Sequence, residues 1–147
     1  MRRNRTGLAN YWWAGDAFVD KRANNKDNRH DMHNFRKLAI WTKSISLVTE
    51  IYQLTNAFPG HERFGLMSQM QRAAVSVPAN IAEGSAKTSN KDFARFLEIS
   101  VGSLLELETE LIIALNLKYI DSMIFENIQN EIIELQKMIT GFKNKLE

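Results

Sequence analysis

The sequence predicts an all-α protein built on one antiparallel, up-and-down four-helix bundle. Three observations predict this class. Apolar residues recur at spacings of three and four along four long segments, short polar or Pro/Gly-containing segments separate them, and no segment alternates apolar and polar residues as a half-buried strand does. Four long helices joined by short connections pack as an antiparallel bundle. We place the bundle at residues 35–147, after a disordered or poorly ordered basic tail at residues 1–34.

The tail differs from the rest of the chain in composition. It is rich in Arg, Asn and Asp and carries one aromatic cluster, Tyr11–Trp13. Residues 20–34 are almost wholly polar and bury too little apolar surface to fold alone. Met32 stands just before the periodic region, so we expect Met32 to be a natural start and the preceding residues to be an upstream extension or a disordered tail. Alternatively, the arginines and tryptophans of the tail bind RNA.

The first helix is predicted over residues 36–57, and Pro59-Gly60 ends it. Two adjoining apolar seams run along it. They are Leu38, Trp41, Ile45, Val48 and Tyr52, and Ile40, Leu47, Ile51, Leu54 and Phe58. Together they form a stripe wider than one neighbour needs, so this helix is expected to touch two neighbours, or one neighbour and another subunit.

The second helix is predicted over residues 62–83, with an apolar stripe of Leu66, Met70, Ala73, Val77 and Ile81. Pro78 stands in its interior, where it lacks an N–H and its ring meets the carbonyl of the preceding turn. We expect a kink there without a break, since the surrounding residues are small. Gly84 is expected to end the helix in the left-handed conformation.

Two polar residues of this helix lie at positions where a polar side chain without a partner would be unfavourable. Asn80 lies among apolar residues, and a buried asparagine can fix register or oligomeric state. Glu83 lies at the helix C-terminus, where the dipole disfavours an acid, so we expect a cationic partner. Arg95, or Arg72 of a neighbouring subunit, could supply it. Alternatively, both side chains cap backbone groups at the turn.

The third helix is predicted from Ser89 to about Leu117, with Asp92 completing a capping arrangement at its start. Its apolar residues repeat as a heptad seam, and Gly102-Ser103 suggests a close helix crossing. Lys118–Ile120 forms the turn. Asp121 then caps the fourth helix, which has its own seam of apolar residues, Ile124, Ile128, Ile132, Leu135, Ile139, Phe142 and Leu146.

The chain carries none of the common catalytic or metal-binding patterns. It has no cysteine, and its three histidines lack the Glu-x-x-His spacing of di-iron bundles. There is no glycine-rich phosphate loop and no Gly-x-Ser-x-Gly elbow. Glu106, Glu108 and Glu110 fan around the helix at spacings of two and are expected to form a solvated face. We therefore expect no enzymatic activity, no metal and no cofactor.

The sequence also predicts where in the cell the protein is found. The longest apolar run, Leu111–Leu115, is far shorter than a membrane span, and the N-terminus lacks an apolar signal segment. The absence of cysteine fits a reducing compartment. We expect a cytoplasmic protein without a membrane partner.

Charge is distributed unevenly although the net charge is only +2. Residues 32–95 hold eight basic and four acidic side chains, whereas residues 96–147 hold four basic and nine acidic ones. This asymmetry indicates a polyanion partner or head-to-side packing between copies, unless it reflects only uneven solvated faces. The candidate phosphate contacts are Arg36, Lys37, Lys43, Arg63, Arg72, Lys87, Lys91 and Arg95.

Several motifs resemble those of one known family. They are Leu38-x-x-Trp41, Phe58-Pro59, Glu62-Arg63-Phe64-Gly65-Leu66, Gln69-x-x-Arg72-Ala73-Ala74-x-Ser76-x-Pro78-x-Asn80-Ile81-Ala82-Glu83-Gly84, Phe93-x-x-Phe96-Leu97 and Ser103-Leu104-x-Glu106-Leu107-Glu108. From Met32 onward the chain resembles the four-helix bundle proteins also described as 23S ribosomal RNA intervening-sequence proteins. The accessory variability proteins of diversity-generating retroelements are similar in fold, bind nucleic acid and assist a reverse transcriptase.

The resemblance implies a small bacterial cytoplasmic protein without known enzymatic activity, assembled as a ring-like homopentamer. It also marks an oligomer or structural motif, made of Gln69, Arg72, Pro78, Asn80, Glu83 and Gly84. Two functions follow as hypotheses. The first is an oligomer that binds the RNA or DNA backbone through a basic surface. The alternative is a protein-interaction scaffold or accessory subunit that docks a partner such as a reverse transcriptase.

Overall fold

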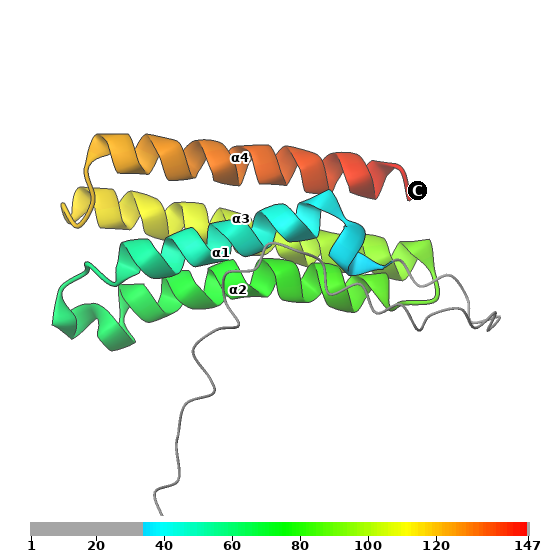
Figure 1. Cartoon of the computed structure of the whole chain (residues 1–147), viewed down its shortest axis with the longest axis horizontal. Helices are drawn as coiled ribbons and strands as arrows, with labels where there is room; N and C mark the ends of the chain where they lie inside the picture. Colours follow the sequence, from blue (N-terminus) through cyan, green and yellow to red (C-terminus); the bar gives the residue numbers. More distant parts are fainter. Residues whose placement is uncertain (1–33, 147) are drawn as a thin grey trace, which may run out of the picture.

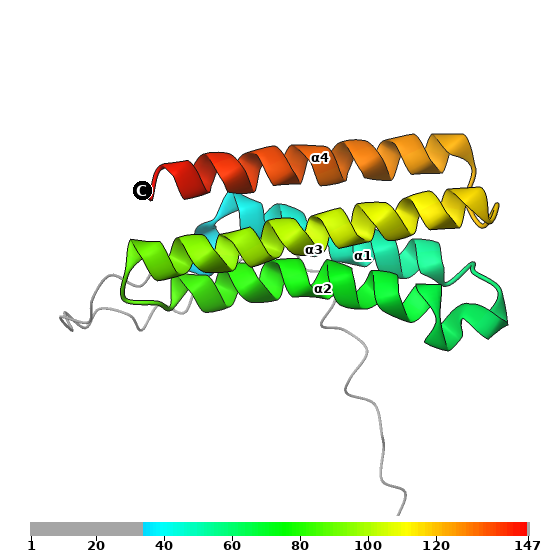
Figure 2. The same ribbon diagram turned by 180° about the vertical axis from the view of Figure 1, so that it is seen from behind.

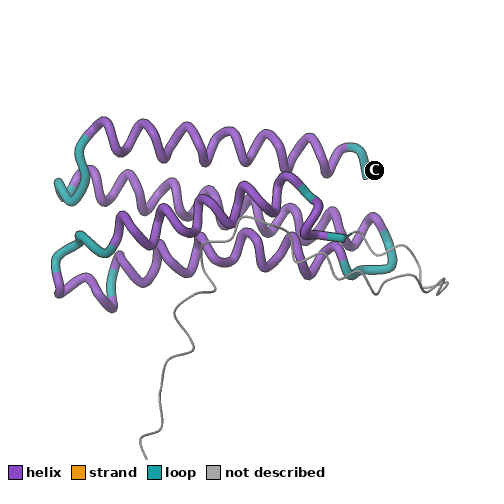
Figure 3. Tube along the Cα trace, in the orientation of Figure 1, coloured by secondary structure: helices purple, strands orange, loops and turns teal. Residues whose placement is uncertain are grey.

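The computed structural model describes residues 34–146, which form four long helices and two short 3₁₀ helices. The long helices are α1 (Ala39–Thr55), α2 (Leu66–Ser85), α3 (Asn90–Asn116) and α4 (Ser122–Asn144), and the short ones are η1 (Phe35–Lys37) and η2 (Gly60–Phe64). Figure 1 shows each long helix running back along the one before it, and Figure 2 gives the same arrangement from behind. The described residues contain helices and loops but no strand, as the colours of Figure 3 show.

The all-α, four-helix fold is therefore confirmed. The predictions for residues 1–33, including the start at Met32 and RNA binding by the tail, lie outside the described residues. In the described part of the chain, no helix has the length and hydropathy needed to cross a membrane.

The core consists of the apolar seams of all four helices. Its fully buried large side chains are Leu47, Ile51, Met70, Ile81, Phe93, Leu97, Leu104, Leu107, Leu111, Ile132, Leu135 and Ile139. The α2–α3 contact is the most extensive helix pair, followed by α1–α2 and α3–α4, and a smaller α1–α4 contact closes the bundle. Burial of this many large apolar groups is the main stabilising contribution to the fold.

The start of α1 differs from the prediction. Residues 35–37 form a 3₁₀ turn, and α1 begins only at Ala39 because Leu38 is extended, with φ −79° and ψ 121°. Asn34 caps that turn by accepting a hydrogen bond from the Arg36 N–H at 3.2 Å. Of the two predicted seams, the one that contains Ile51 faces the core, whereas Tyr52 on the other seam is exposed.

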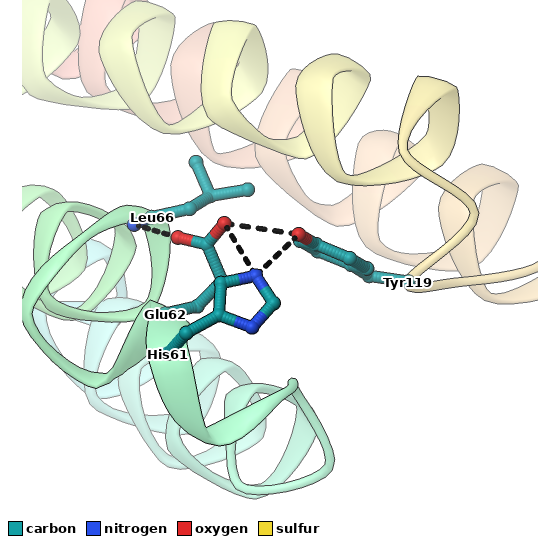
Figure 4. A network of polar contacts seen from close by, with 4 residues as sticks. All are labelled: His61, Glu62, Leu66 and Tyr119. Atoms are coloured by element: carbon teal, nitrogen blue, oxygen red, sulfur yellow. Dashed lines mark hydrogen bonds and ion pairs between the residues drawn. The ribbon is translucent and has the colours of Figure 1, made fainter.

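The start of α2 also differs, because η2 occupies the first residues predicted to be α-helical. Glu62 accepts a hydrogen bond from the Leu66 N–H at 2.8 Å and so caps α2 from one turn upstream. Tyr119, from the α3–α4 loop, donates its hydroxyl to the other carboxylate oxygen at 2.9 Å. Figure 4 shows Glu62 held between these two groups, with His61 beside them.

Gly84 does not end α2, so the prediction of a left-handed terminal glycine was wrong. It lies inside the helix, it is buried, and no described glycine has a positive φ. A Cβ at Gly84 would stand 2.7 Å from atoms of both Phe93 and Phe96. Glycine is needed here because α3 begins directly against the α2 backbone. Pro78 leaves α2 unbroken, as predicted.

The starts of α3 and α4 follow the prediction. Ser89 accepts a hydrogen bond from the Asp92 N–H at 3.1 Å and donates its hydroxyl to the Asp92 carboxylate at 2.7 Å. Asp121 accepts from the Ile124 N–H at 2.8 Å. The expected close crossing at Gly102-Ser103 is correct only for Ser103, since a Cβ at Gly102 would meet nothing within 4 Å.

Candidate nucleic-acid interface

One end of the bundle gathers basic side chains from both halves of the sequence. α1 and α3 begin at this end, and α2 and α4 finish there, as Figures 1 and 2 show from opposite sides. We call it the basic end. Its basic residues are Arg36, Lys37, Lys87, Lys91, Arg95, Lys137, Lys143 and Lys145. The topology therefore brings together basic residues that are far apart in the sequence.

Most of these cations are not neutralised. Lys143 pairs with Glu98 at 3.0 Å, and Lys87 pairs with Glu83 at 3.5 Å while its ammonium lies over an aromatic ring. Within residues 34–146, no ion pair to an acidic side chain is formed by Arg36, Lys37, Lys91, Arg95, Lys137 and Lys145. The basic end thus carries a surplus of positive charge, which attracts polyanions.

Five of the eight predicted phosphate contacts lie at the basic end, and three do not. Lys43 pairs with Glu134 of α4 at 2.9 Å, and Arg63 lies over the Phe64 ring in η2 at the opposite end. Arg72 lies midway along α2. The sequence reasoning missed Lys137, Lys143 and Lys145, because they belong to the acidic half of the chain. The up-and-down topology, which returns α4 to the start of α1, was the signal that could have found them.

Two pockets flank the C-terminal end of α4. One, of about 380 Å³, separates α4 from the start of α1, and Lys37, Lys137 and Lys145 contribute to its lining. The other, of about 560 Å³, lies toward α3 and is lined by Lys91, Ala94, Arg95, Glu98 and Leu146. Both pockets open among basic-end residues.

Some of the residues marked by the resemblance lie at the contact between α2 and α3. Asn80 is half-buried, and its amide donates to the Ser76 carbonyl at 2.8 Å and to the Ser76 hydroxyl at 3.0 Å. Ser103 of α3 donates to the same hydroxyl at 2.9 Å, and Ser100 donates to the Val77 carbonyl at 3.1 Å. Pro78 and Gly84 are buried, while Gln69 and Arg72 are exposed. Gly84 and Asn80 of the motif therefore contribute to the α2–α3 contact within one chain.

Within the chain, the cation paired with Glu83 is Lys87, four residues later, and not Arg95 as expected. Pairing with Arg72 of a neighbouring subunit stays a prediction. Both side chains are substantially exposed, so the pair contributes little to stability. The helix continues through Ser85, which places Lys87 just beyond the helix end and within reach of the acid.

Glu110 is buried, so the expectation of a solvated face of three acids was wrong. Only 7% of the residue is exposed, and within the described chain its Oε2 atom has no hydrogen-bond partner. Burial, and then the nearby Glu106, raise the pKa of Glu110 to about 7 against the opposing effect of Arg72. Glu108 is half-buried and accepts hydrogen bonds from Gln129 and Gln136 of α4.

Exposed apolar side chains accompany Glu110 on the same side of α3. Ile99, Ile113 and Leu117 are 50%, 42% and 49% exposed. Their spacing from Glu110 places them along one strip of the helix. Among the described residues, no group of three or more histidines and acids is arranged to hold a metal ion.

Comparison with known proteins places this fold in a family. The model of the family described as 23S rRNA-intervening sequence protein matches residues 36–141. A solved structure from Bacteroides thetaiotaomicron, described as a protein with unknown function from the S23 ribosomal protein family, is similar at 26% identity with a TM-score of 0.66. The match covers 71% of this chain and 97% of that one. A search of curated proteins found no match. The chain belongs to the 23S rRNA-intervening sequence protein family.

Proposed function

We propose that this protein is a non-enzymatic, cytoplasmic nucleic-acid-binding protein that contacts the phosphate backbone of RNA or DNA through the basic end. The observation that carries the proposal is the convergence, on one end of the bundle, of cations from η1, α3 and the C-terminal part of α4 that form no ion pair within residues 34–146. Phosphate contacts of this kind position a nucleic acid without reading its sequence. The names of the family and of the solved relative, which refer to 23S rRNA and to a ribosomal protein, support RNA as the partner.

Salt dependence tests this proposal. Lysines and arginines that neutralise phosphates release counterions, so affinity falls steeply as salt rises. Fluorescence anisotropy with labelled RNA over a salt series should show that fall. A variant with Lys37, Lys91 and Arg95 changed to Gln should bind more weakly at every salt concentration. The matched control changes Arg63, Arg72 and Lys118 to Gln, which removes the same charge away from the basic end. Equal weakening by both variants would contradict a localised interface.

A second candidate function is a scaffold formed by self-association, and the exposed strip of α3 favours it. Ile99, Ile113 and Leu117 are exposed beside the buried Glu110, whose Oε2 atom has no hydrogen-bond donor within the described residues. A neighbouring copy would cover the strip, and the family resemblance points to a pentamer. A partner protein such as a reverse transcriptase would then dock on the assembly.

Sizing with multi-angle light scattering tests the second candidate. An oligomer is expected at micromolar concentration, and Ile113→Glu should dissociate it because the substitution places a charge in the apolar strip. Leu105→Glu is the control, since Leu105 is similarly exposed on α3 but lies outside that strip. A monomeric wild-type protein would rule this candidate out.

A further inference from the structure

The pocket between the start of α1 and the end of α4 combines a charged rim with an apolar floor. Its charged lining comes from Lys37, Lys137 and Lys145, and its apolar lining includes Leu38, Ile40, Met138 and Phe142. The volume of about 380 Å³ lies within the range of small-ligand sites. Among residues 34–146, no acidic residue lines this pocket. The charge of the lining therefore favours an anion.

The first turn of α1 strengthens the preference for an anion. Ala39 and Ile40, its first two residues, line the pocket, and Leu38 at the N-cap supplies no side-chain hydrogen bond to the helix. The first N–H groups of a helix have no partner within the helix and carry partial positive charge. Such N–H groups beside three lysines suit a phosphate.

The floor of the pocket suits a flat apolar group. Phe142 is half-buried, and its ring meets the Phe93 ring edge-on with centroids 5.6 Å apart. The ring is thus held from behind by the core. Gly141 stands at the pocket wall, and a Cβ there would meet nothing within 4 Å. The absence of a side chain at this position leaves the pocket open next to Phe142.

We propose that this pocket takes one unstacked nucleotide of a bound single strand, with a phosphate among the three lysines and the base against Met138 and Phe142. The inference rests on the proposed nucleic-acid binding and adds to it a preference for single strands. Phosphate contacts alone would favour a duplex, which carries more charge per unit length. A duplex keeps its bases stacked and cannot fill the pocket, whereas an aromatic floor binds any base of a single strand.

Filling the pocket without changing charge tests the inference. Gly141→Leu places a side chain in the opening, and Gly102→Leu is the matched control, because Gly102 is also an exposed helical glycine with no neighbour within 4 Å. The probes are an oligouridine of about 12 nucleotides and a fully paired RNA duplex of the same length. The full-length protein is used, and circular dichroism confirms that each variant is helical.

The expected results separate this inference from the proposed function. Gly141→Leu should weaken oligouridine binding about tenfold while changing duplex binding less than about twofold, and Gly102→Leu should change neither. Lys137→Gln, at an exposed position, should also weaken oligouridine binding more than duplex binding. Unchanged oligouridine binding by Gly141→Leu, or equal loss for both probes, would overturn the pocket while leaving the basic end in place. Failure of wild-type protein to bind either probe would overturn both.

Discussion

The Tyr119 hydroxyl donates a hydrogen bond to Glu62 Oε1 at 2.9 Å and so ties the α3–α4 loop to the residue that caps α2. These residues are far apart in sequence, and their contact fixes the end of the bundle opposite the basic end. Phe58 packs against the Tyr119 ring, with centroids 5.3 Å apart. One carboxylate thus joins a helix cap to a loop.

Tyr119→Phe should lower Tm by roughly 2–4 °C, because it removes the hydrogen bond to Glu62 and the longer contact with His61 and keeps the ring contact. Thermal unfolding followed by circular dichroism measures the change. Tyr52→Phe, at an exposed position on α1, is the control and should leave Tm unchanged. An equal Tm for wild type and Tyr119→Phe would show that the hydrogen bond does not contribute to stability.

Glu62 should contribute stability that is lost in acid. The Leu66 N–H, and then the Tyr119 hydroxyl, hold the pKa of Glu62 below its ordinary value of 4.5. A depressed folded-state pKa gives stability above the unfolded value that disappears as pH falls through the folded one. Urea denaturation of Glu62→Gln at several pH values should therefore show a deficit relative to wild type at neutral pH that shrinks below pH 4.5. A deficit that does not change with pH would contradict this linkage.

Glu110 should have the opposite effect to that of Glu62 on how stability depends on pH. Its folded-state pKa of about 7 lies above the ordinary value of 4.5, so the native state holds the extra proton and the free energy of unfolding falls as pH rises between these values. Glu110→Gln should stabilise the protein above pH 7 by up to about 3 kcal/mol, with little effect near pH 4. Urea denaturation at both pH values measures this difference.

Comparison with a second acid makes that test specific. Burial, and then the proximity of Glu131, also raise the pKa of Glu50. The stability of the wild-type protein therefore falls with rising pH because of Glu50 as well as Glu110. The quantity to compare is the difference between Glu110→Gln and wild type at each pH, with Glu50→Gln measured in parallel. A Glu110→Gln variant that is less stable than wild type at pH 8 would refute the burial argument.

Gly84→Ala should destabilise the protein by about 1–3 kcal/mol, because the new methyl group meets two phenylalanine side chains at the start of α3. Gly102→Ala and Gly141→Ala should raise stability by about 0.5–1 kcal/mol, since both positions are helical and open. Chemical denaturation of the three variants gives the comparison. Stabilisation by Gly84→Ala would mean that α3 can move away at no cost.

Single substitutions at the basic end should each change the salt dependence of RNA binding. Lys91→Gln or Lys145→Gln should reduce the slope of log affinity against log salt by about 1 if that side chain contacts a phosphate. Arg63→Gln, at the opposite end of the bundle, should leave the slope unchanged. Anisotropy titrations over a salt series provide these slopes, and a change caused by Arg63→Gln alone would place the interface elsewhere.

The features predicted correctly from sequence are those that depend on near neighbours. The capping at Ser89 and Asp121 uses groups three residues away, and the seams of α2, α3 and α4 follow from helical periodicity. The prediction for Gly84 was wrong because the local sequence does not distinguish two roles of a glycine near a helix end. It can end the helix in a left-handed conformation, or it can leave room for an aromatic ring of another helix. Only the approach of α3 distinguishes the two cases.

The same reasoning explains the errors at charged residues. Spacing alone shows that Glu108 points away from Glu106 and Glu110, which share one helix face, but which of the three meets another helix depends on how α2 and α4 pack around α3. The basic end was only partly predicted because Lys137 and Lys145 join it through the bundle topology. Arg72 and Lys43 were predicted to join the same basic surface, but the bundle topology places them elsewhere.

The connection between α2 and α3 bears on how the chain folds. Only residues 86–89 separate the two helices, so closing this hairpin costs little chain entropy, and the pair has the most extensive contact in the bundle. We expect the transition state to contain this hairpin, so that Ser103→Ala mainly slows folding while substitutions at the α1–α4 contact mainly speed unfolding. The small side chains that let α2 and α3 meet would then also determine how fast the chain finds its native state.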